Sequence, residues 1–157
     1  MTRGRQGVRT AAKAHAQFTQ ADVRAAVAGL RGSTSFRAPL REYTSFKIGG
    51  PADVVCEPAD IDDVCLVVRQ ARAHKIPMFV LGGTNLLIRD GGIRGIVVSL
   101  ARLRAIKEEP TAVLYAEGGV GMPTLIGYAI RHSLAGLEWA AGIPGTAAGC
   151  VVMNAGT

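Results

Sequence analysis

The segment from Ala52 to Leu81 switches between two hydrophobic periods, and this switch restricts the fold more than any other feature. Ala52 to Glu57 is a continuous apolar run, typical of a buried strand, and Pro58 ends it. Asp60 can cap a following helix, and Met78 to Leu81 forms a second short apolar run. A strand, a helix and a strand in this order predict a lobe built from both element types. The expected apolar face of the helix comprises Ile61, Val64, Cys65, Val68 and Ala71.

Further elements are expected on both sides of this unit. A helix is predicted from about Gln20 to Arg31, with Thr19 as its N-cap, packed outside the main lobe. The predicted strands are Ile96 to Leu100, Leu103 to Lys107 and Ala112 to Glu117, followed by a helix from Pro123 to about Ser133 that is buried on both sides. The segment from Val151 to Asn154 resembles a strand entering a sheet, and the chain is expected to be truncated there.

Charge and composition divide the chain into four expected parts. Residues 1–31 carry six Lys or Arg and one Asp, whereas the remainder carries twelve basic and eleven acidic residues. The basic N-terminal arm is expected to be a solvated extension, with nucleic-acid binding as the alternative. The expected parts are a basic flexible leader (1–17), a helix and linker (18–39), a first lobe (40–121) and the start of a second lobe (122–157).

The sequence also excludes several classes of protein. No apolar run approaches 18 residues, so no transmembrane segment and no membrane partner is expected. The three cysteines lack the spacing of a metal site, so no metal is predicted. A few unclustered cysteines fit a reducing compartment, and the cytoplasm is the expected location.

A glycine turn after the second apolar run is the first candidate binding element. Gly82 and Gly83 let the backbone approach an anion closely, and Thr84 and Asn85 add side-chain donors. This chemistry suits a diphosphate, although an ordinary tight turn has the same composition. The P-loop pattern is absent, and Thr124 stands where the third glycine of a Rossmann fingerprint would be.

A loop of small residues is the second candidate. Gly142 to Gly149 and Met153 to Gly156 are dense in Gly and Ala, which lets backbone lie flat against a planar or extended ligand. The alternative is a tightly packed loop in which small residues simply fit. A third segment, Lys47 to Asp53, is by itself only a turn that leads into the first strand.

Together, in this order, these segments resemble the FAD-binding domain of the UDP-N-acetylenolpyruvoylglucosamine reductases. The matching text lies at Thr44 to Asp53, Leu81 to Gly92, Gly136 to Thr146 and Met153 to Gly156, and the resemblance extends from about Leu40 to Thr157. It implies an α+β, two-lobed FAD-binding domain of the p-cresol methylhydroxylase and vanillyl-alcohol oxidase type. The second lobe is expected to be incomplete and the C-terminal substrate domain absent.

The resemblance also implies a cofactor, a reaction and a set of site residues. It implies non-covalent FAD, NADPH as reductant, and reduction of UDP-N-acetylglucosamine enolpyruvate to UDP-N-acetylmuramate in peptidoglycan synthesis. The UDP-sugar is expected to bind through the absent domain. No residue of this chain inherits the family's catalytic roles, which are expected beyond Thr157. The implied cofactor-binding residues are Gly82, Gly83, Thr84, Asn85, Leu86, Leu87, Gly142, Ile143, Pro144, Gly145, Thr146, Gly149, Asn154, Ala155 and Gly156.

Two departures from the family pattern bear on these expectations. The glycine turn is one residue shorter than the usual L-G-x-G-[ST]-N, which is expected to weaken binding. Ala148 stands where a second glycine is common, and its methyl group is expected to crowd the cofactor if its φ is positive. Two alternatives are another FAD-dependent oxidoreductase of the same fold and a non-catalytic module that binds flavin or nucleic acid.

Overall fold

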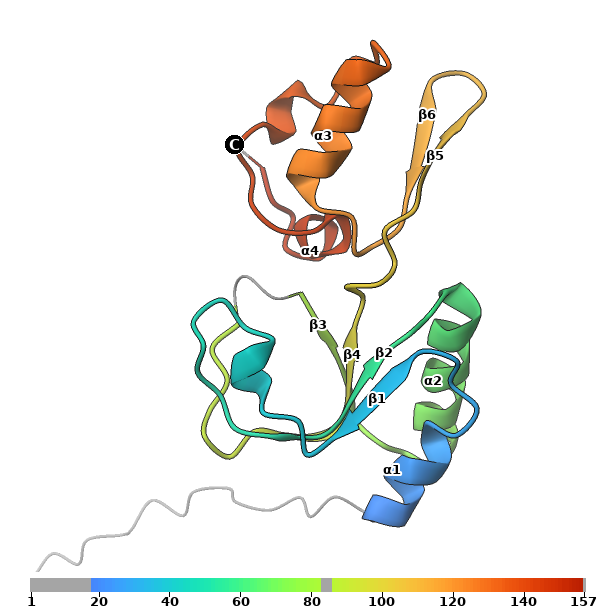
Figure 1. The fold of residues 1–157 in the computed structure, drawn as a ribbon, viewed down its shortest axis with the longest axis vertical. Coiled ribbons are helices and arrows are strands. Elements are labelled where there is room, and N and C mark those ends of the chain that lie inside the picture. Colours follow the sequence, from blue (N-terminus) through green and yellow to red (C-terminus); the bar gives the residue numbers. More distant parts are fainter. Residues whose placement is uncertain (1–17, 83–85, 157) are drawn as a thin grey trace, which may run out of the picture.

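The computed structural model describes residues 18–82 and 86–156, and its elements form two lobes (Figure 1). The first lobe carries a four-stranded sheet with two helices, and the second carries a hairpin with two helices and a short 3₁₀ turn. In chain order the elements are α1 (Gln20–Ala26), β1 (Ser33–Phe36), η1 (Leu40–Glu42), β2 (Ala52–Glu57), α2 (Ile61–Ala73), β3 (Met78–Leu81), β4 (Ile93–Ser99), β5 (Ile106–Glu109), β6 (Val113–Ala116), α3 (Met122–Arg131), η2 (Glu138–Ala140) and α4 (Ala147–Val152).

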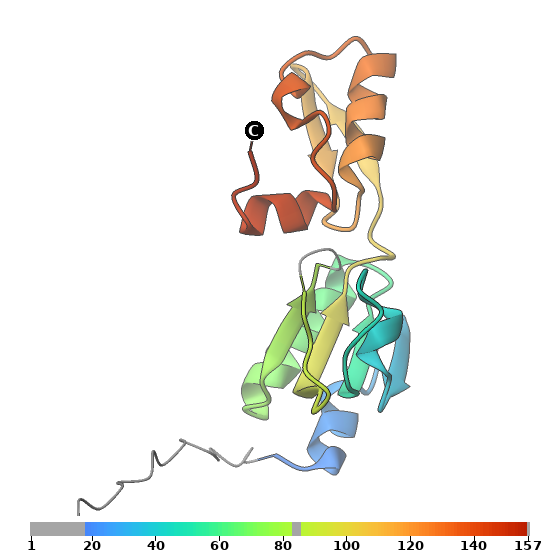
Figure 2. The ribbon, with the colours of Figure 1, turned by 90° about the vertical axis from the view of Figure 1, so that its left-hand side faces the viewer.

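The first sheet has the strand order β1-β2-β4-β3. β2 and β3 both pair with β4 in parallel, whereas β1 pairs with β2 in the antiparallel sense. The predicted strand–helix–strand unit is therefore confirmed as β2-α2-β3, with β4 inserted between its two strands. The carboxyl ends of the three parallel strands lie at the edge of the sheet that faces the second lobe (Figures 1 and 2).

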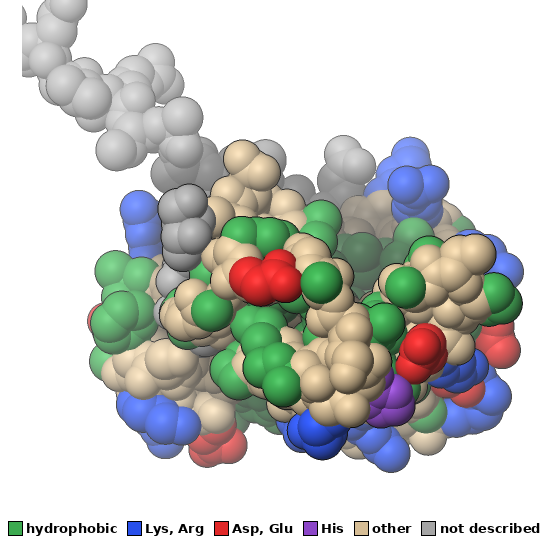
Figure 3. Space-filling view, turned by 90° about the horizontal axis from the view of Figure 1, so that it is seen from above, with side chains coloured by type: hydrophobic (Ala, Val, Ile, Leu, Met, Phe, Trp, Pro, Cys, Tyr) green, Lys and Arg blue, Asp and Glu red, His purple; other side chains and the backbone are tan. Residues whose placement is uncertain are grey.

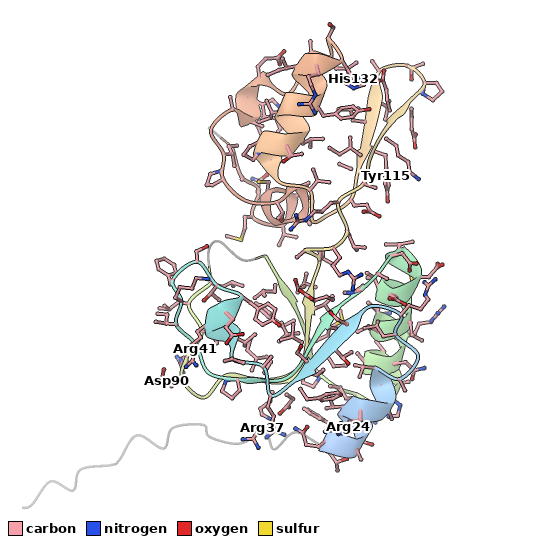
Figure 4. All side chains as sticks on the ribbon, viewed as in Figure 1. Arg24, Arg37, Arg41, Asp90, Tyr115 and His132 are labelled. Carbon is pink, nitrogen blue, oxygen red and sulfur yellow. The ribbon has the colours of Figure 1, made fainter. Side chains whose placement is uncertain are left out.

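α1 belongs to the core of the first lobe and is shorter than predicted. Thr19 caps it as expected and forms a capping box with Asp22. The helix ends at Ala26, well before Arg31, because the chain turns through Gly29, whose φ is +87°. Val23 and Ala26 are fully buried against β2 and α2, so the expectation of an outer appendage was wrong. The Arg24 guanidinium covers the ring of Phe36 at 4.2 Å (Figure 4).

α2 presents a different face to the core from the one predicted. Asp60 caps the helix as expected, but the buried positions are Asp63, Val67 and Ala71, and Ile61 and Cys65 are exposed. The reason is that Asp63 is turned inward, where its carboxylate accepts hydrogen bonds from the backbone N–H groups of residues 31, 32 and 59. Burial opposes its ionisation, but these bonds and the Arg31 side chain outweigh burial and lower the pKa of Asp63 to about 2.

The second lobe forms around one apolar cluster. Val120, Leu125 and Cys150 lie at its centre, and side chains of β5 and β6 pack against it. The hairpin predicted for the first lobe thus belongs to the second, because Ile106 and Leu114 contact this cluster. His132, at the end of α3, adds a second link to the hairpin, since its Nδ1 lies 3.1 Å from Glu108 Oε2 (Figure 4).

Two predictions for the second lobe were wrong. α3 is buried on one side only, because Ile130 is 71% exposed while Leu125 and Ala129 are buried. The segment predicted as a strand from Val151 to Asn154 instead ends α4 at Val152 and then forms a turn. Thr146 starts this helix by accepting a hydrogen bond from the N–H of Gly149 at 3.3 Å. Hydrophobic side chains reach the surface of this lobe (Figure 3), and Val151 and Val152 are more than 80% exposed.

Candidate functional site

A cavity of about 590 Å³ lies between the lobes. The carboxyl ends of the parallel strands lie on its first-lobe side, and α4 lies on its second-lobe side. Figure 2 shows α4 above these strand ends. Crevices at the carboxyl ends of parallel strands are the usual ligand sites of such sheets, and this volume is typical of small-molecule sites. The lining residues are Tyr43, Glu57, Phe79, Val80, Leu81, Gly82, Leu86, Ser99, Leu100, Ala101, Gly119, Pro144, Gly145, Thr146, Ala148, Gly149, Cys150, Val152, Met153 and Ala155.

The first lobe supplies one wall from the ends of its three parallel strands. β2 contributes Glu57, β4 contributes Ser99, and β3 contributes Phe79 to Leu81. Gly82 follows β3 directly, and a Cβ built on it would meet none of the described residues within 4 Å. The cavity therefore comes close to the backbone at this glycine without a side chain in between.

The second lobe supplies the opposite wall from the loop of small residues and from α4. Gly145 has a φ of +111°, which favours glycine, and its carbonyl accepts a hydrogen bond from the N–H of Met122 at 2.9 Å. Thr146 forms an isolated bridge with Gly121. The loop is thereby fastened to the start of α3, and its small residues face the first lobe across the cavity.

The described lining of the cavity is mostly apolar and includes few polar groups. Among the described lining residues, Glu57 is the one charged side chain, and its Oε2 accepts a hydrogen bond from the Ser33 hydroxyl at 2.9 Å. Tyr43, Ser99 and Thr146 add hydroxyl groups. Apolar walls with a few polar groups suit a ligand that carries a large ring system and a limited number of hydrogen-bonding sites.

The structure brings part of the predicted site together. Gly82 and Leu86 from the glycine turn line the same cavity as Pro144, Gly145, Thr146, Gly149 and Ala155 from the second loop. Leu87, Gly142, Ile143, Asn154 and Gly156 do not line it, and Ile143 is buried in the core of the second lobe. The predicted residues Gly83, Thr84 and Asn85 lie outside the described residues.

Several lining residues were not anticipated from the sequence. Glu57, Ser99 and Phe79 belong to strands that were correctly located, yet they were not connected with a site. The available signal was the parallel order of the strands, because their carboxyl ends converge on one edge. Ala148 also lines the cavity, but it lies inside α4 and does not have a positive φ, so its methyl group is not strained there.

Comparisons with known proteins agree on one family. A model of the family described as FAD binding domain matches residues 52–157. The UDP-N-acetylenolpyruvoylglucosamine reductase of Caldanaerobacter subterraneus is 46% identical over 126 residues, which are 80% of this chain and 41% of that protein. The reductase of Rubrobacter xylanophilus is 49% identical over 126 residues, 79% of this chain and 42% of that protein. The chain thus spans about two fifths of the length of these relatives.

Solved structures show the same likeness. The UDP-N-acetylenolpyruvylglucosamine reductase of Thermus caldophilus matches 82% of this chain and 44% of its own, with a TM-score of 0.62 and 31% identity. A berberine bridge enzyme variant matches 71% of this chain and 26% of its own, with a TM-score of 0.54 and 14% identity, which is a likeness of fold alone. In the described ranges, no helix has the length and apolar character needed to cross a membrane.

Proposed function

Since the chain belongs to the FAD-binding domain family and is a homologue of the UDP-N-acetylenolpyruvoylglucosamine reductases, we propose that the cavity between its lobes holds FAD non-covalently. The observation that carries this proposal is that Gly82 and Leu86 of the first lobe and Pro144 to Thr146 of the second line one cavity. Two loops whose composition suits a dinucleotide serve one ligand only if they face each other.

The described residues fit such a ligand. Gly82 leaves open space beside its backbone, as close contact with a diphosphate requires. The apolar side chains of Phe79, Val80 and Val152 offer surface for a planar ring. We assign cofactor contacts to Gly82, Leu86, Pro144, Gly145, Thr146, Gly149 and Ala155. The resemblance also implies contacts for Gly83, Thr84 and Asn85, which lie outside the described residues. Leu87, Gly142, Ile143, Asn154 and Gly156 receive no contact, because they do not line the cavity.

In the complete enzyme, we infer, NADPH is the reductant and a UDP-sugar with an enolpyruvyl group is the substrate, as in cytoplasmic peptidoglycan synthesis. FAD, when bound, supplies the hydride-transfer chemistry. The contribution of this chain is to bind and orient the cofactor between the two walls of the cavity and to keep water from its ring. The groups that donate the proton and stabilise the enolate are not assigned to any residue of this chain.

Binding of FAD tests the proposal directly. FAD is titrated into the purified chain and into the variants Gly82→Phe and Gly91→Phe, with flavin fluorescence as the readout. Neither glycine has a positive φ, and an added Cβ would have no neighbour within 4 Å in the part of the chain that the structure describes, so both variants are expected to fold. Gly82→Phe fills the cavity and should weaken FAD binding at least tenfold, whereas Gly91 lies outside the cavity and its variant should bind like the parent chain.

Absence of FAD binding by the parent chain would overturn the proposal, as would equal binding by both variants. A second assay mixes the chain with FAD, NADPH and UDP-N-acetylglucosamine enolpyruvate and follows NADPH absorbance. We expect no substrate-dependent oxidation by this chain alone, because positioned acid–base and electrostatic groups contribute orders of magnitude in rate. Turnover near about 1 s⁻¹, ordinary for enzymes, would place the reaction within these residues.

A further inference from the structure

Glu57 is a charged group in the cavity that the assigned cofactor contacts do not use. It ends β2, and Ser33 on the neighbouring strand β1 is its register partner. The Ser33 hydroxyl donates to Oε2 at 2.9 Å. None of the ion pairs among the described residues involves Glu57, so its negative charge is not neutralised by a neighbouring cation there.

A carboxylate in an apolar cavity favours a ligand that brings hydrogen-bond donors. Its two oxygens offer about four acceptor positions, and Ser33 occupies one of them. A ligand that buries the other acceptor positions of the carboxylate without donating hydrogen bonds to them binds unfavourably. The same negative charge repels phosphate. The end of the cavity at Glu57 therefore selects hydroxyl or amino groups and disfavours the anionic part of a nucleotide.

The position of Glu57 in the sheet relates it to the glycine turn. β4 lies between β2 and β3, so Glu57 and Gly82 are separated by two interstrand spacings, or roughly 10 Å. A diphosphate beside Gly82 would keep its charge away from Glu57 at that separation. The apolar residues Phe79 and Val80 lie on β3, at the far edge of the sheet from β1 and Ser33.

From this arrangement we propose that Glu57 accepts hydrogen bonds from the adenosine half of the dinucleotide, through its ribose hydroxyls or its adenine amino group. The flavin ring then lies toward the apolar side of the cavity. Glu57 would thus make the cavity selective for FAD over FMN, which lacks adenosine. This inference rests on the proposed function, because it assigns a residue to one half of the proposed cofactor.

The test compares the affinities of the chain for FAD, FMN and ADP by isothermal titration. Glu57→Gln removes the charge with little change in shape, and hydrogen bonds to charged groups contribute enough to predict a loss of about tenfold or more. FAD and ADP should bind about tenfold more weakly to Glu57→Gln, and FMN should bind equally to both proteins. Glu109→Gln, on the exposed β5 and outside the cavity, is the matched control and should bind all three ligands like the parent chain.

Ser33→Ala is a second variant in case Glu57→Gln does not fold, which far-UV circular dichroism would show. Ser33→Ala keeps the Glu57 carboxylate but removes the hydroxyl that donates a hydrogen bond to it. This variant should bind FAD a few-fold more weakly, while FMN binding stays constant. Unchanged or stronger FAD binding by Glu57→Gln, with the parent chain binding FAD, would overturn the assignment of Glu57 and leave the proposed function standing. An equal loss of FMN would also overturn it, because Glu57 would then contact the flavin half. A parent chain that binds no FAD removes both.

Discussion

The two lobes bury their side chains to very different extents. The first lobe has a four-stranded sheet with an apolar cluster on each face. Among the largest fully buried side chains of the described residues, Val120 alone belongs to the second lobe. The second lobe rests on a two-stranded hairpin and one cluster, and it exposes Ile130, Val151 and Val152.

This difference shows that the elements that carry the two walls of the cavity are packed to different extents. The wall from the first lobe is formed by the ends of strands that are packed against apolar clusters on both faces of the sheet. The core of the lobe therefore fixes the geometry of this wall. The wall from the second lobe rests on a short helix and a two-stranded sheet, an arrangement that is only marginally stable without further packing. A ligand between the lobes thus meets one rigid wall and one that opens more easily.

Hydrogen exchange measures this contrast most directly and should show the largest effect. Amides of β2 and β4 are expected to exchange at least about 100-fold more slowly than amides of α3 and the β5-β6 hairpin, because local opening needs less free energy where fewer apolar groups are buried. Mass spectrometry of peptides from each lobe gives the rates. Equal protection in both lobes would mean that they unfold as one cooperative unit.

Substitution of Asp63 should destabilise the first lobe specifically. Asp63→Asn weakens a buried acceptor that holds the backbone N–H groups of Arg31, Gly32 and Ala59, and we expect a loss of roughly 3 kcal/mol in the free energy of unfolding. Denaturant titration followed by exchange in β2 gives the value. Asp62→Asn, at a side chain that is 85% exposed, should change stability by less than about 0.5 kcal/mol.

The pH dependence of the stability of the parent chain and of Asp63→Asn tests whether the charge of Asp63 causes the loss. Because the pKa of Asp63 is lowered from the ordinary 3.8 to about 2 in the folded chain, its contribution is complete above pH 3.8 and is lost as the pH falls through about 2. The difference in stability between the parent chain and Asp63→Asn should therefore shrink between pH 4 and pH 2. A stability difference that stays constant over this range would mean that the shape of the Asp63 side chain, and not its charge, stabilises the backbone of Arg31, Gly32 and Ala59.

The smallest effect is expected from the cap of α4. Thr146→Ala removes the hydroxyl that accepts from the N–H of Gly149, and such a change costs about 1 kcal/mol of helix stability. Exchange should rise in α4 while β2 and β4 stay unchanged. Thr124→Ala, at an exposed position of α3 outside the cavity, provides a comparison in the same lobe that leaves both walls intact. Faster exchange in the first sheet would contradict the separation of the lobes.

The sequence predicted the first lobe better than the second for a physical reason. The run Ala52 to Glu57 and the cap at Asp60 are local signals, and both were confirmed. The face of α2 was not predictable from hydrophobic period, because a buried carboxylate satisfied by distant backbone groups determines it. The helix at Val151 was missed because a β-branched pair favours a strand until the cap at Thr146 is considered.

The parts of the candidate site that have a distinctive composition could be predicted from the sequence. The parts that depend on the order of the strands could not. Gly82 and the loop from Pro144 to Thr146 were candidates because of their small residues and were assigned to FAD through the resemblance, and the structure places them in one cavity. Glu57 and Ser99 reach that cavity only because β2 and β4 run in parallel. Strand order depends on long-range packing, which a local period does not encode.

The path of the chain between the lobes has one further consequence. Within the described residues the chain passes from the first lobe to the second once, between Leu100 and Ala105, and no strand pairs across that boundary. Each wall of the cavity is therefore encoded by an uninterrupted stretch of sequence. Recombination with a related gene between Leu100 and Ala105 would keep every strand pair within each lobe. It would combine the cavity wall of one parent protein with the opposite wall of another. Natural or engineered chimeras built at this position would vary the ligand without redesigning either core.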